Sequence, residues 1–195
     1  MSTLAEVKLW GRTIGAVSLE DEGQTAAFQY DAAFARSGIQ VAPLLMPLGE
    51  RVYTFPDLPR GTFHGLPGLL ADSLPDKFGN ALIDAWLATQ GRRPESFNAV
   101  ERLCYTGARG MGALEFAPMM GPRAQRATTV EIDALVRLAS DVMSQREGLR
   151  SSLADEERAK ALTDILRVGT SAGGARAKAV IAWNRTTNEV RSGQI

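Results

Sequence analysis

Cysteine and histidine are scarce in this sequence of 195 residues, which contains one of each, Cys104 and His64. A single cysteine cannot form a disulfide within the chain, which is typical of proteins from reducing compartments. One cysteine and one histidine also cannot supply the ligands of a typical zinc site, so we expect no metal centre. His64 is the one candidate imidazole for base catalysis, but its place between Phe63 and Gly65 indicates a structural residue that forms hydrogen bonds.

An excess of charge and a long apolar run are also missing. The 22 basic and 22 acidic side chains cancel, which removes any global attraction to nucleic acid or to an anionic membrane. No apolar run approaches the roughly 20 residues that span a bilayer, and the start lacks the pattern of a secretory signal. We therefore expect a cytoplasmic protein that binds neither a membrane nor nucleic acid directly. Its hydrophobic content of 45% is sufficient for a folded core.

Familiar catalytic motifs are missing as well. The sequence contains no Gly-x-Ser-x-Gly elbow, no His-Arg-Asp catalytic loop and no Asp-Phe-Gly metal site. Cys104 lies on the apolar face of a predicted helix, which indicates a buried, unreactive thiol. The pair Asp72 and Asp76 and the run Glu20-Asp-Glu22 are better explained as caps and turn residues than as a carboxylate dyad. We therefore assign no catalytic residue.

The first sixty residues alternate apolar and polar side chains, as strands do. Residues 5–19 predict a hairpin with the turn Trp10-Gly-Arg-Thr13, and Phe28–Tyr30 and Arg51–Phe55 predict two further strands. The segment Ala42–Leu48 is apolar but holds two prolines. We expect it to be an extended segment packed on the core.

The middle of the sequence shows helical spacing of apolar residues. Asp72-Ser-Leu-Pro-Asp76 predicts the start of a helix, and Gly91 predicts its end. Ser96 is the predicted cap of a second helix that ends at Gly107. Gly112–Pro118 then predicts a strand that rejoins the sheet.

Beyond this strand the composition changes. Gly121–Thr128 is rich in proline, arginine and glutamine, which predicts a linker. A helix is predicted from about Thr129 to Gln145, with an apolar stripe that includes Val136 and Ala139, and another from Ala154 to about Leu166.

The segment Arg102–Gly112 ends in three glycines among six residues, which demand unusual backbone angles. Arg109 stands between two of them, on a loop where it could meet a ligand or a partner. A tight connection between the helix and the strand is the alternative, and the sequence leaves both open.

The strongest chemical signal is the run Val168–Lys178. Its three glycines and four other small residues let backbone N–H groups approach an anion, and two basic side chains supply charge. The candidate phosphate-binding residues are Gly169, Thr170, Ser171, Ala172, Gly173, Gly174, Ala175, Arg176 and Lys178. The run is neither a Walker A loop, which requires lysine where Ala175 stands, nor a Rossmann fingerprint. A plain flexible connector is the alternative.

A hairpin is predicted directly after this run. Val180–Trp183 predicts a strand, Asn184–Asn188 a turn, and Glu189–Arg191 a returning strand. A glycine-rich loop that leads into a hairpin is how protein kinases cover nucleotide phosphates.

Two motifs in the middle of the chain are highly specific. They are Gly65-Leu-Pro-Gly-Leu-Leu-Ala-Asp-Ser-Leu-Pro-Asp76, within residues 63–80, and Gly107-x-Arg-Gly-Met-Gly112, within residues 96–116. In these segments the chain resembles the amino-terminal half of HipA-like serine/threonine kinases, the toxins of type II toxin–antitoxin modules. The resemblance implies an α+β fold. A β-rich amino-terminal subdomain with inserted helices would occupy residues 1–120, and residues 121–195 would hold a helical segment and the start of a kinase N-lobe-like subdomain.

The resemblance also implies a role for the glycine-rich run. In the family, the segment that corresponds to residues 171–178 binds the nucleotide, so ATP and Mg²⁺ are the implied cofactors, although we expect this chain alone not to bind them tightly. Some members autophosphorylate the position that matches Ser171, which ejects the loop and switches the kinase off. A phosphate there would add about two negative charges where the ATP phosphates must lie.

The catalytic groups of the family lie beyond the position of Ile195. We therefore expect an inactive amino-terminal fragment whose partner is a HipB-like DNA-binding antitoxin. The alternatives are a stand-alone subunit that binds and restrains a separate kinase subunit, or a degenerate relic. A last hairpin strand at this point would leave one edge of a sheet exposed. We expect this edge to be covered by a continuation of the chain, by another chain or by self-association.

Overall fold

The computed structural model describes residues 2–20, 24–110, 112–121, 136, 139–140 and 181–192. The chain divides into two compact units, residues 1–74 with 98–121 and residues 75–97 with 122–195. The first unit is discontinuous in sequence, because the chain leaves it after Leu74 and returns at Asn98. The predicted domains, residues 1–120 and 121–195, stay a prediction.

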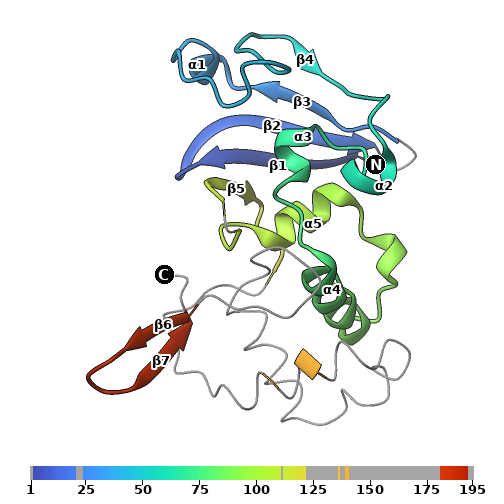
Figure 1. Cartoon of the computed structure of the whole chain (residues 1–195). Helices are drawn as coiled ribbons and strands as arrows, with labels where there is room; N and C mark the ends of the chain where they lie inside the picture. The colour runs from blue at the N-terminus through green and yellow to red at the C-terminus, as the bar shows by residue number, and fades with distance from the viewer. Residues whose placement is uncertain are drawn as a thin grey trace. The chain divides into compact units, whose positions relative to one another are not determined.

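A five-stranded antiparallel sheet forms the centre of the first unit (Figure 1). Its strands lie in the order β4-β3-β2-β1-β5. Their bounds are Ser2–Leu9 for β1, Arg12–Glu20 for β2, Ala27–Tyr30 for β3, Val52–Tyr53 for β4 and Leu114–Ala117 for β5. The predicted return of a late strand is confirmed, because β5 pairs with β1. The fold is thus α+β with a mainly antiparallel sheet, and the kinase N-lobe-like continuation stays a prediction.

The predicted hairpin is confirmed by β1 and β2. The register pairs Leu9 with Arg12, which leaves Trp10 and Gly11 as a two-residue turn. Both turn residues lie in the left-handed region, with φ of 48° and 76°. Turns of this kind match the twist of the strands they join.

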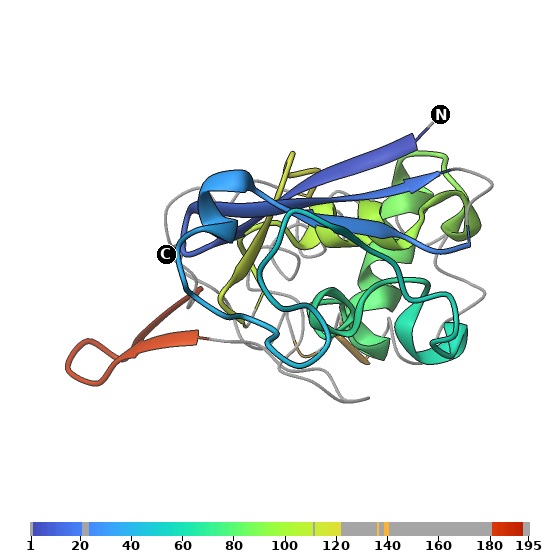
Figure 2. The ribbon, with the colours of Figure 1, turned by 90° about the horizontal axis from the view of Figure 1, so that it is seen from above.

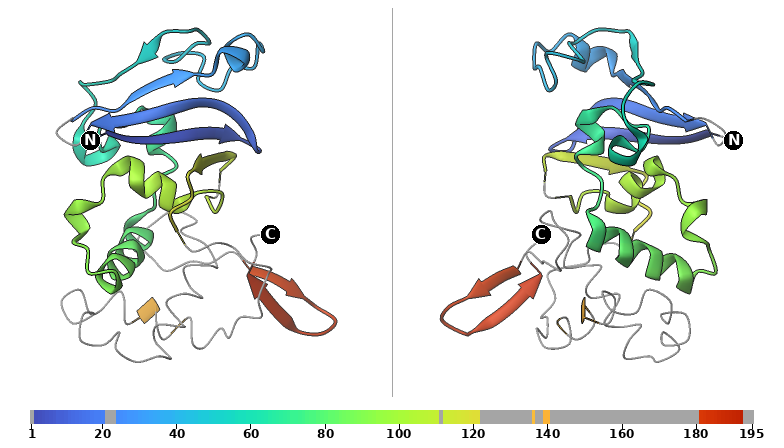
Figure 3. Two further views of the ribbon diagram at one scale, coloured as in Figure 1. Left: turned by 180° about the vertical axis from the view of Figure 1, so that it is seen from behind. Right: turned by 45° about the vertical axis from the view of Figure 1, so that its right-hand side comes forward.

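One face of the sheet carries the core. Alternate side chains of β1 and β2, among them Val7 and Val17, are fully buried. They share one apolar cluster with Leu70 of α3 (Gly68–Ala71) and Leu103 of α5 (Ala99–Thr106). Figure 2 shows the sheet from above, and Figure 3, on the left, shows its strands from behind. The core lies between the sheet and these helices, as expected for a sheet with one buried face.

Two further helices of one turn belong to this unit, α1 (Ala32–Ala35) and α2 (Arg60–Phe63). The Asp31 carboxylate caps α1 by accepting hydrogen bonds from the N–H groups of Ala33 and Phe34. Phe34 is buried and stacks on Tyr30 of β3, with ring centroids 5.9 Å apart. α1 is thereby anchored to the sheet.

The start of α5 differs from the prediction. Ser96 ends a short 3₁₀ helix, η1 (Pro94–Ser96), and does not cap α5. Asn98 is the cap, because its side chain accepts from Glu101 N–H while the Glu101 carboxylate accepts from Asn98 N–H. This reciprocal capping box satisfies two backbone donors, whereas serine at position 96 reaches only the Arg93 carbonyl. The predicted end at Gly107 is confirmed.

The segment that joins α1 to β4 also departs from the prediction. Residues 42–48 form turns and not an extended segment, since Met46 N–H donates to the Ala42 carbonyl at 2.9 Å. The contact with the core is confirmed, because Met46 is buried and its carbonyl accepts from Tyr30 Oη at 2.8 Å. The predicted strand at residues 51–55 shortens to the two residues of β4. A strand this short limits the sheet edge that it exposes.

The described part of the second unit contains α4 (Lys77–Thr89), η1, and the strands β6 (Ile181–Asn184) and β7 (Glu189–Ser192). The predicted helix start is confirmed, because the Asp76 carboxylate caps α4 and accepts from Gly79 N–H at 2.8 Å. Gly91 takes a φ of 69° just beyond the helix, as a predicted terminator should. In the described residues, no helix is both long and apolar enough to cross a bilayer.

Few residues of the predicted helix at 129–145 can be described. Val136, Ala139 and Ser140 are helical. Ala139 is buried, but Val136 is 62% exposed, so its assignment to a buried apolar stripe was wrong. The predicted linker beyond Gly121 and the predicted helix at 154–166 lie outside the described residues.

Candidate functional site

The hairpin predicted after the glycine-rich run is confirmed. β6 and β7 pair in antiparallel register, with Trp183 opposite Val190. Asn184 stabilises the turn, since its side-chain oxygen accepts from the N–H groups of Thr186 and Thr187 at 2.9 and 3.3 Å. An asparagine side chain that bonds two residues onward is a common turn device.

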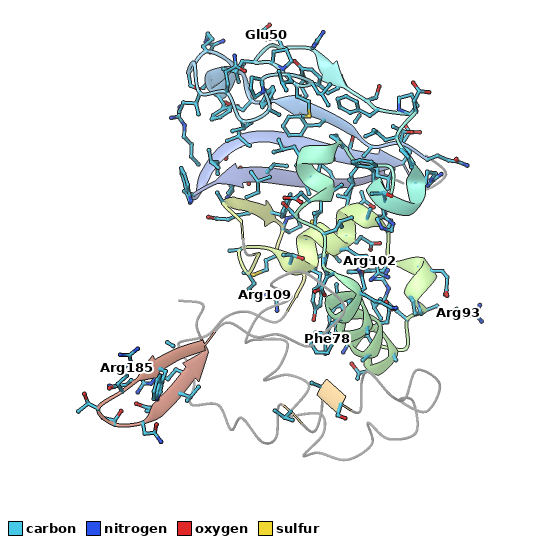
Figure 4. All side chains as sticks on the ribbon, viewed as in Figure 1. Glu50, Phe78, Arg93, Arg102, Arg109 and Arg185 are labelled. Carbon is cyan, nitrogen blue, oxygen red and sulfur yellow. The ribbon has the colours of Figure 1, made fainter. Side chains whose placement is uncertain are left out.

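Side-chain contacts also fix the turn end of this hairpin. The indole N–H of Trp183 donates to the Asn188 side chain at 3.1 Å. The Arg185 guanidinium lies 5.7 Å from the Trp183 ring centroid, and Figure 4 shows Arg185 on the hairpin. Arg191 and Glu189 form an exposed ion pair at 2.9 Å. The hairpin therefore has a defined geometry around its turn.

The candidate phosphate-binding residues themselves lie outside the described part of the chain. They are Gly169, Thr170, Ser171, Ala172, Gly173, Gly174, Ala175, Arg176 and Lys178. Their assignment to a nucleotide-binding loop, and that of Ser171 to autophosphorylation, stay predictions.

Arg109 does not lie on an open loop as one of the two sequence interpretations suggested. Its side chain is 1% exposed, and Figure 4 marks its place after α5. It donates to the Tyr105 carbonyl, and its guanidinium lies 5.0 Å from the Tyr105 ring centroid. Burial lowers the pKa of Arg109, while the same burial raises the pKa of Tyr105. The alternative, a tight connection between helix and strand, is correct.

The glycines of this connection explain its shape. Gly107 has a φ of 57°, and a Cβ there would come within 2.8 Å of Met119 Cγ. A side chain on Gly121 would meet the Arg109 guanidinium. The Gly107 carbonyl accepts from Phe116 N–H at 3.3 Å, which places the connection along β5. Gly107 of the motif and Gly121 beyond β5 thus allow Met119 and the buried Arg109 to approach the backbone closely.

Cys104 behaves as predicted. It is 1% exposed within the core cluster, and burial, followed by the nearby Glu101 charge, raises the pKa of its thiol to about 11. A thiol with this pKa is almost entirely protonated at neutral pH, so it is a poor nucleophile.

His64 has a structural role through its backbone. It caps α2 with a left-handed φ of 52°, and its N–H donates to the Arg60 carbonyl at 2.9 Å. Its imidazole is exposed. No three histidine, cysteine, aspartate or glutamate side chains gather as metal ligands in the described residues.

The acidic residues that the sequence suggested as caps or turn residues have different outcomes. Asp76 caps α4, whereas Asp72 is the last residue of the α3 turn and does not begin α4. Glu20 ends β2, and Asp21 and Glu22 lie outside the described residues.

Sequence reasoning missed the exposed apolar residues of the first unit. Trp10, in the β1–β2 turn, is 79% exposed, and Leu44 is 92% exposed. For Trp10 a signal was present in the sequence, because a tryptophan directly before glycine in a hairpin turn cannot reach the core. For Leu44 no signal of exposure was present, because the sequence around it shows only an apolar run.

Comparison with known proteins identifies the family of this chain. No curated protein matches this sequence significantly. The family model described as the HipA N-terminal domain matches residues 5–117. This range begins within β1 and ends at the last residue of β5, so it spans all five strands of the sheet and α1 to α5. It also covers more than half of the 195 residues. The chain therefore belongs to the HipA N-terminal domain family.

Proposed function

We propose that this chain serves as the amino-terminal part of a HipA-like serine/threonine kinase toxin. In this role it contributes a glycine-rich loop, residues 169–178, that covers ATP, and surfaces that contact a protein partner. The family match at residues 5–117 carries the proposal. The β6–β7 hairpin supports it, because a hairpin directly after such a loop is the arrangement used by protein kinases.

The proposed loop would bind phosphate through its backbone. Glycines and small residues leave the N–H groups accessible to phosphate oxygens, and Arg176 and Lys178 add positive charge. Phosphorylation of Ser171 would place a competing anion in the same loop and switch it off.

Phosphoryl transfer itself needs groups that these 195 residues do not provide. The sequence has neither the His-Arg-Asp loop nor the Asp-Phe-Gly metal site of protein kinases. In the described residues, no cluster of His, Cys, Asp or Glu could hold Mg²⁺. We propose that the chain by itself binds nucleotide weakly and transfers no phosphate.

The proposed partner is a HipB-like DNA-binding antitoxin. The formal net charge of zero gives this chain no general attraction to DNA, which suits a toxin that leaves DNA contacts to its antitoxin. The partner would therefore recognise protein surface on the first unit.

Nucleotide binding can be tested by NMR. Mg-ATP titrated into the ¹⁵N-labelled chain should shift the amide signals of residues 169–178. Lys178→Ala should weaken the binding by about tenfold, the loss expected for one charge-assisted hydrogen bond. Lys160→Ala, a lysine outside the loop, is the matched control and should change nothing. Unshifted loop amides, or equal binding by Lys178→Ala, would refute the role of the loop.

Two further measurements test the rest of the proposal. If the reading frame beside this chain encodes a DNA-binding protein, its co-expression with the chain should give a stable complex. If the neighbouring protein is instead a kinase subunit that this chain inhibits, the chain is a stand-alone restraining subunit.

A phosphotransfer activity that persists through purification and is lost in Lys178→Ala would contradict the proposal that the chain alone is inactive.

A further inference from the structure

The carbonyl groups at the end of α5 are satisfied from two directions. Those of Leu103 and Thr106 accept hydrogen bonds from the connection that directly follows the helix. The Cys104 carbonyl instead accepts from the N–H of Met120, a residue beyond β5, at 3.0 Å. A helix end needs such partners because its last carbonyls have none within the helix. The chain beyond β5 therefore completes the end of α5.

Met119 holds this part of the chain against the connection. A Cβ on Gly107 would come within 2.8 Å of Met119 Cγ and within 3.0 Å of its Sδ, so the thioether lies directly on the Gly107 backbone. The soft, polarisable sulfur of methionine suits a close apolar contact of this kind. The Met119 side chain and the Met120 N–H thus contact the same helix end from neighbouring positions.

The methionines that the structure describes differ in their access to solvent. Met119 is 42% exposed and Met120 is 36% exposed, whereas Met46 is 2% exposed in the core. Methionine is a common target of oxidation, and a small oxidant reaches an exposed side chain far more readily than a buried one. A peroxide can therefore reach Met119 in the folded chain, while Met46 is protected.

Oxidation would change the contact at Gly107. It converts the flexible, apolar thioether into a polar sulfoxide. The close approach of Met119 to Gly107 leaves no space for an added oxygen on that side of the sulfur. The sulfoxide oxygen is also a hydrogen-bond acceptor, which is more stable in water than packed against a contact that offers it no donor. The oxidised side chain should therefore leave Gly107.

This departure would weaken the neighbouring hydrogen bond. Cys104 is 1% exposed, so its carbonyl would lose its partner in a buried environment if the Met120 N–H moved away. A buried carbonyl without a partner costs its full desolvation penalty. Because α5 packs on the sheet through the core cluster, loosening its end should destabilise the first unit.

We propose that Met119 is a peroxide-sensitive modification site that controls the stability of the end of α5. The sulfur attacks one oxygen of hydrogen peroxide, so that an S–O bond forms and the O–O bond breaks. The proton on the transferred oxygen moves to the leaving hydroxide, which departs as water. The thioether is thereby oxidised to a sulfoxide and the peroxide is reduced. Methionine sulfoxide reductases reverse the change, and the site needs neither nucleotide nor a partner protein.

Mild treatment of the full chain with hydrogen peroxide tests the proposal. Peptide mass spectrometry should find Met119 oxidised and Met46 intact. Urea unfolding of the treated wild type should give an unfolding equilibrium constant about tenfold larger than before treatment, as expected for one buried carbonyl that loses its partner. A methionine sulfoxide reductase should restore the original value.

Two leucine variants separate Met119 from the other methionines. Met119→Leu keeps the size and apolar character of the side chain, so treatment should change its stability much less than that of the wild type. Met120→Leu is the matched control with similar exposure. It should stay as sensitive as the wild type, because residue 120 bonds Cys104 through its backbone N–H. Equal sensitivity of Met119→Leu and the wild type would overturn the proposal.

Hydrogen exchange provides a readout that needs no variant. In the oxidised wild type, the Met120 amide should exchange about tenfold faster than in the untreated chain. The Ala26 amide, which donates to the Gly65 carbonyl at 2.8 Å in the same unit, should change much less. Unchanged protection of Met120 once Met119 is oxidised would overturn the proposal, and so would resistance of Met119 to peroxide in the folded chain.

Discussion

Cys104 and Tyr30 are both acids that the fold keeps protonated. Burial raises the pKa of Cys104 from 9.0 to about 11 and that of Tyr30 from 10.0 to about 12. In the unfolded chain each group loses its proton at its ordinary pKa, so above pH 9 the folded state holds more protons than the unfolded state. Stability then decreases as the pH rises.

We therefore predict alkaline destabilisation that begins near pH 9. Between pH 9 and 11 the Cys104 thiol alone should lower the free energy of unfolding by roughly 2–3 kcal/mol. Urea unfolding at pH 8, 9, 10 and 11 measures this change. Cys104→Ala should lose about 1 kcal/mol at pH 7 but show a shallower decrease above pH 9. An unchanged slope in that variant would rule out the thiol as the cause.

Gly15 provides a second prediction at this scale. It lies in β2, and a Cβ there would come within 2.7 Å of the Phe28 ring and would also meet the Gln29 carbonyl. Gly15→Ala should therefore cost about 2–3 kcal/mol through overpacking. Gly61→Ala is the matched control, because nothing lies within 4 Å of its Cβ position in α2. If thermal unfolding shows the same stability for both variants, the close approach at Gly15 is not real.

At the scale of elements, the start of α5 shows how little separates a correct cap from a wrong one. Ser96 and Asn98 are both good capping residues by type. Position 98 is selected because Glu101 stands three residues later and completes the box, and because Asn98 Nδ2 donates to Thr3 Oγ1 of β1 at 2.8 Å. The position of Glu101 can be read from the sequence, but only the fold brings Thr3 of β1 next to the start of α5.

This difference predicts unequal effects of two alanine substitutions. Asn98→Ala should lower the free energy of unfolding by about 1–2 kcal/mol, since α5 loses its cap and its bond to β1. Ser96→Ala should change it by less than about 0.5 kcal/mol, because Ser96 is exposed in η1. Chemical denaturation of both variants is the measurement. A larger loss of unfolding free energy in Ser96→Ala than in Asn98→Ala would show that Ser96 is the cap, as the sequence predicted.

At the scale of the whole molecule, the discontinuous first unit determines which pieces can fold. The sheet needs β5 beside β1, and Val100, Leu103 and Phe116 belong to the core cluster. These residues enter the unit only after the chain returns at Asn98. A piece that stops before this point lacks one edge of the sheet and part of its buried face.

We predict that residues 1–121 fold cooperatively and that residues 1–97 do not. Circular dichroism with urea should give a single sigmoidal transition for the longer piece and a shallow one for the shorter. As a control, residues 1–112, which contain α5 but not β5, should be less stable than residues 1–121. Cooperative folding of residues 1–97 would contradict the role of β5.

The sequence by itself determined the local elements of this protein. Alternation predicted the β1–β2 hairpin, β3 and β5, helical spacing and Asp76 predicted α4, and Asn184 with its neighbours predicted the turn between β6 and β7. These features depend on contacts within a few residues, so the pattern along the chain contains them. The glycine-rich loop was predicted in the same way, but it lies outside the described residues.

Only the tertiary structure decided the environment of individual side chains. Arg109 is buried by Tyr105 and by the chain around Gly121, and the Trp10 N–H donates to the carbonyl of Ala113, directly before β5. Neither partner of these contacts is marked by a pattern beside Arg109 or Trp10 in the sequence. Burial depends on segments that are distant in sequence and close in space, and the strand order β4-β3-β2-β1-β5 is what brings them together.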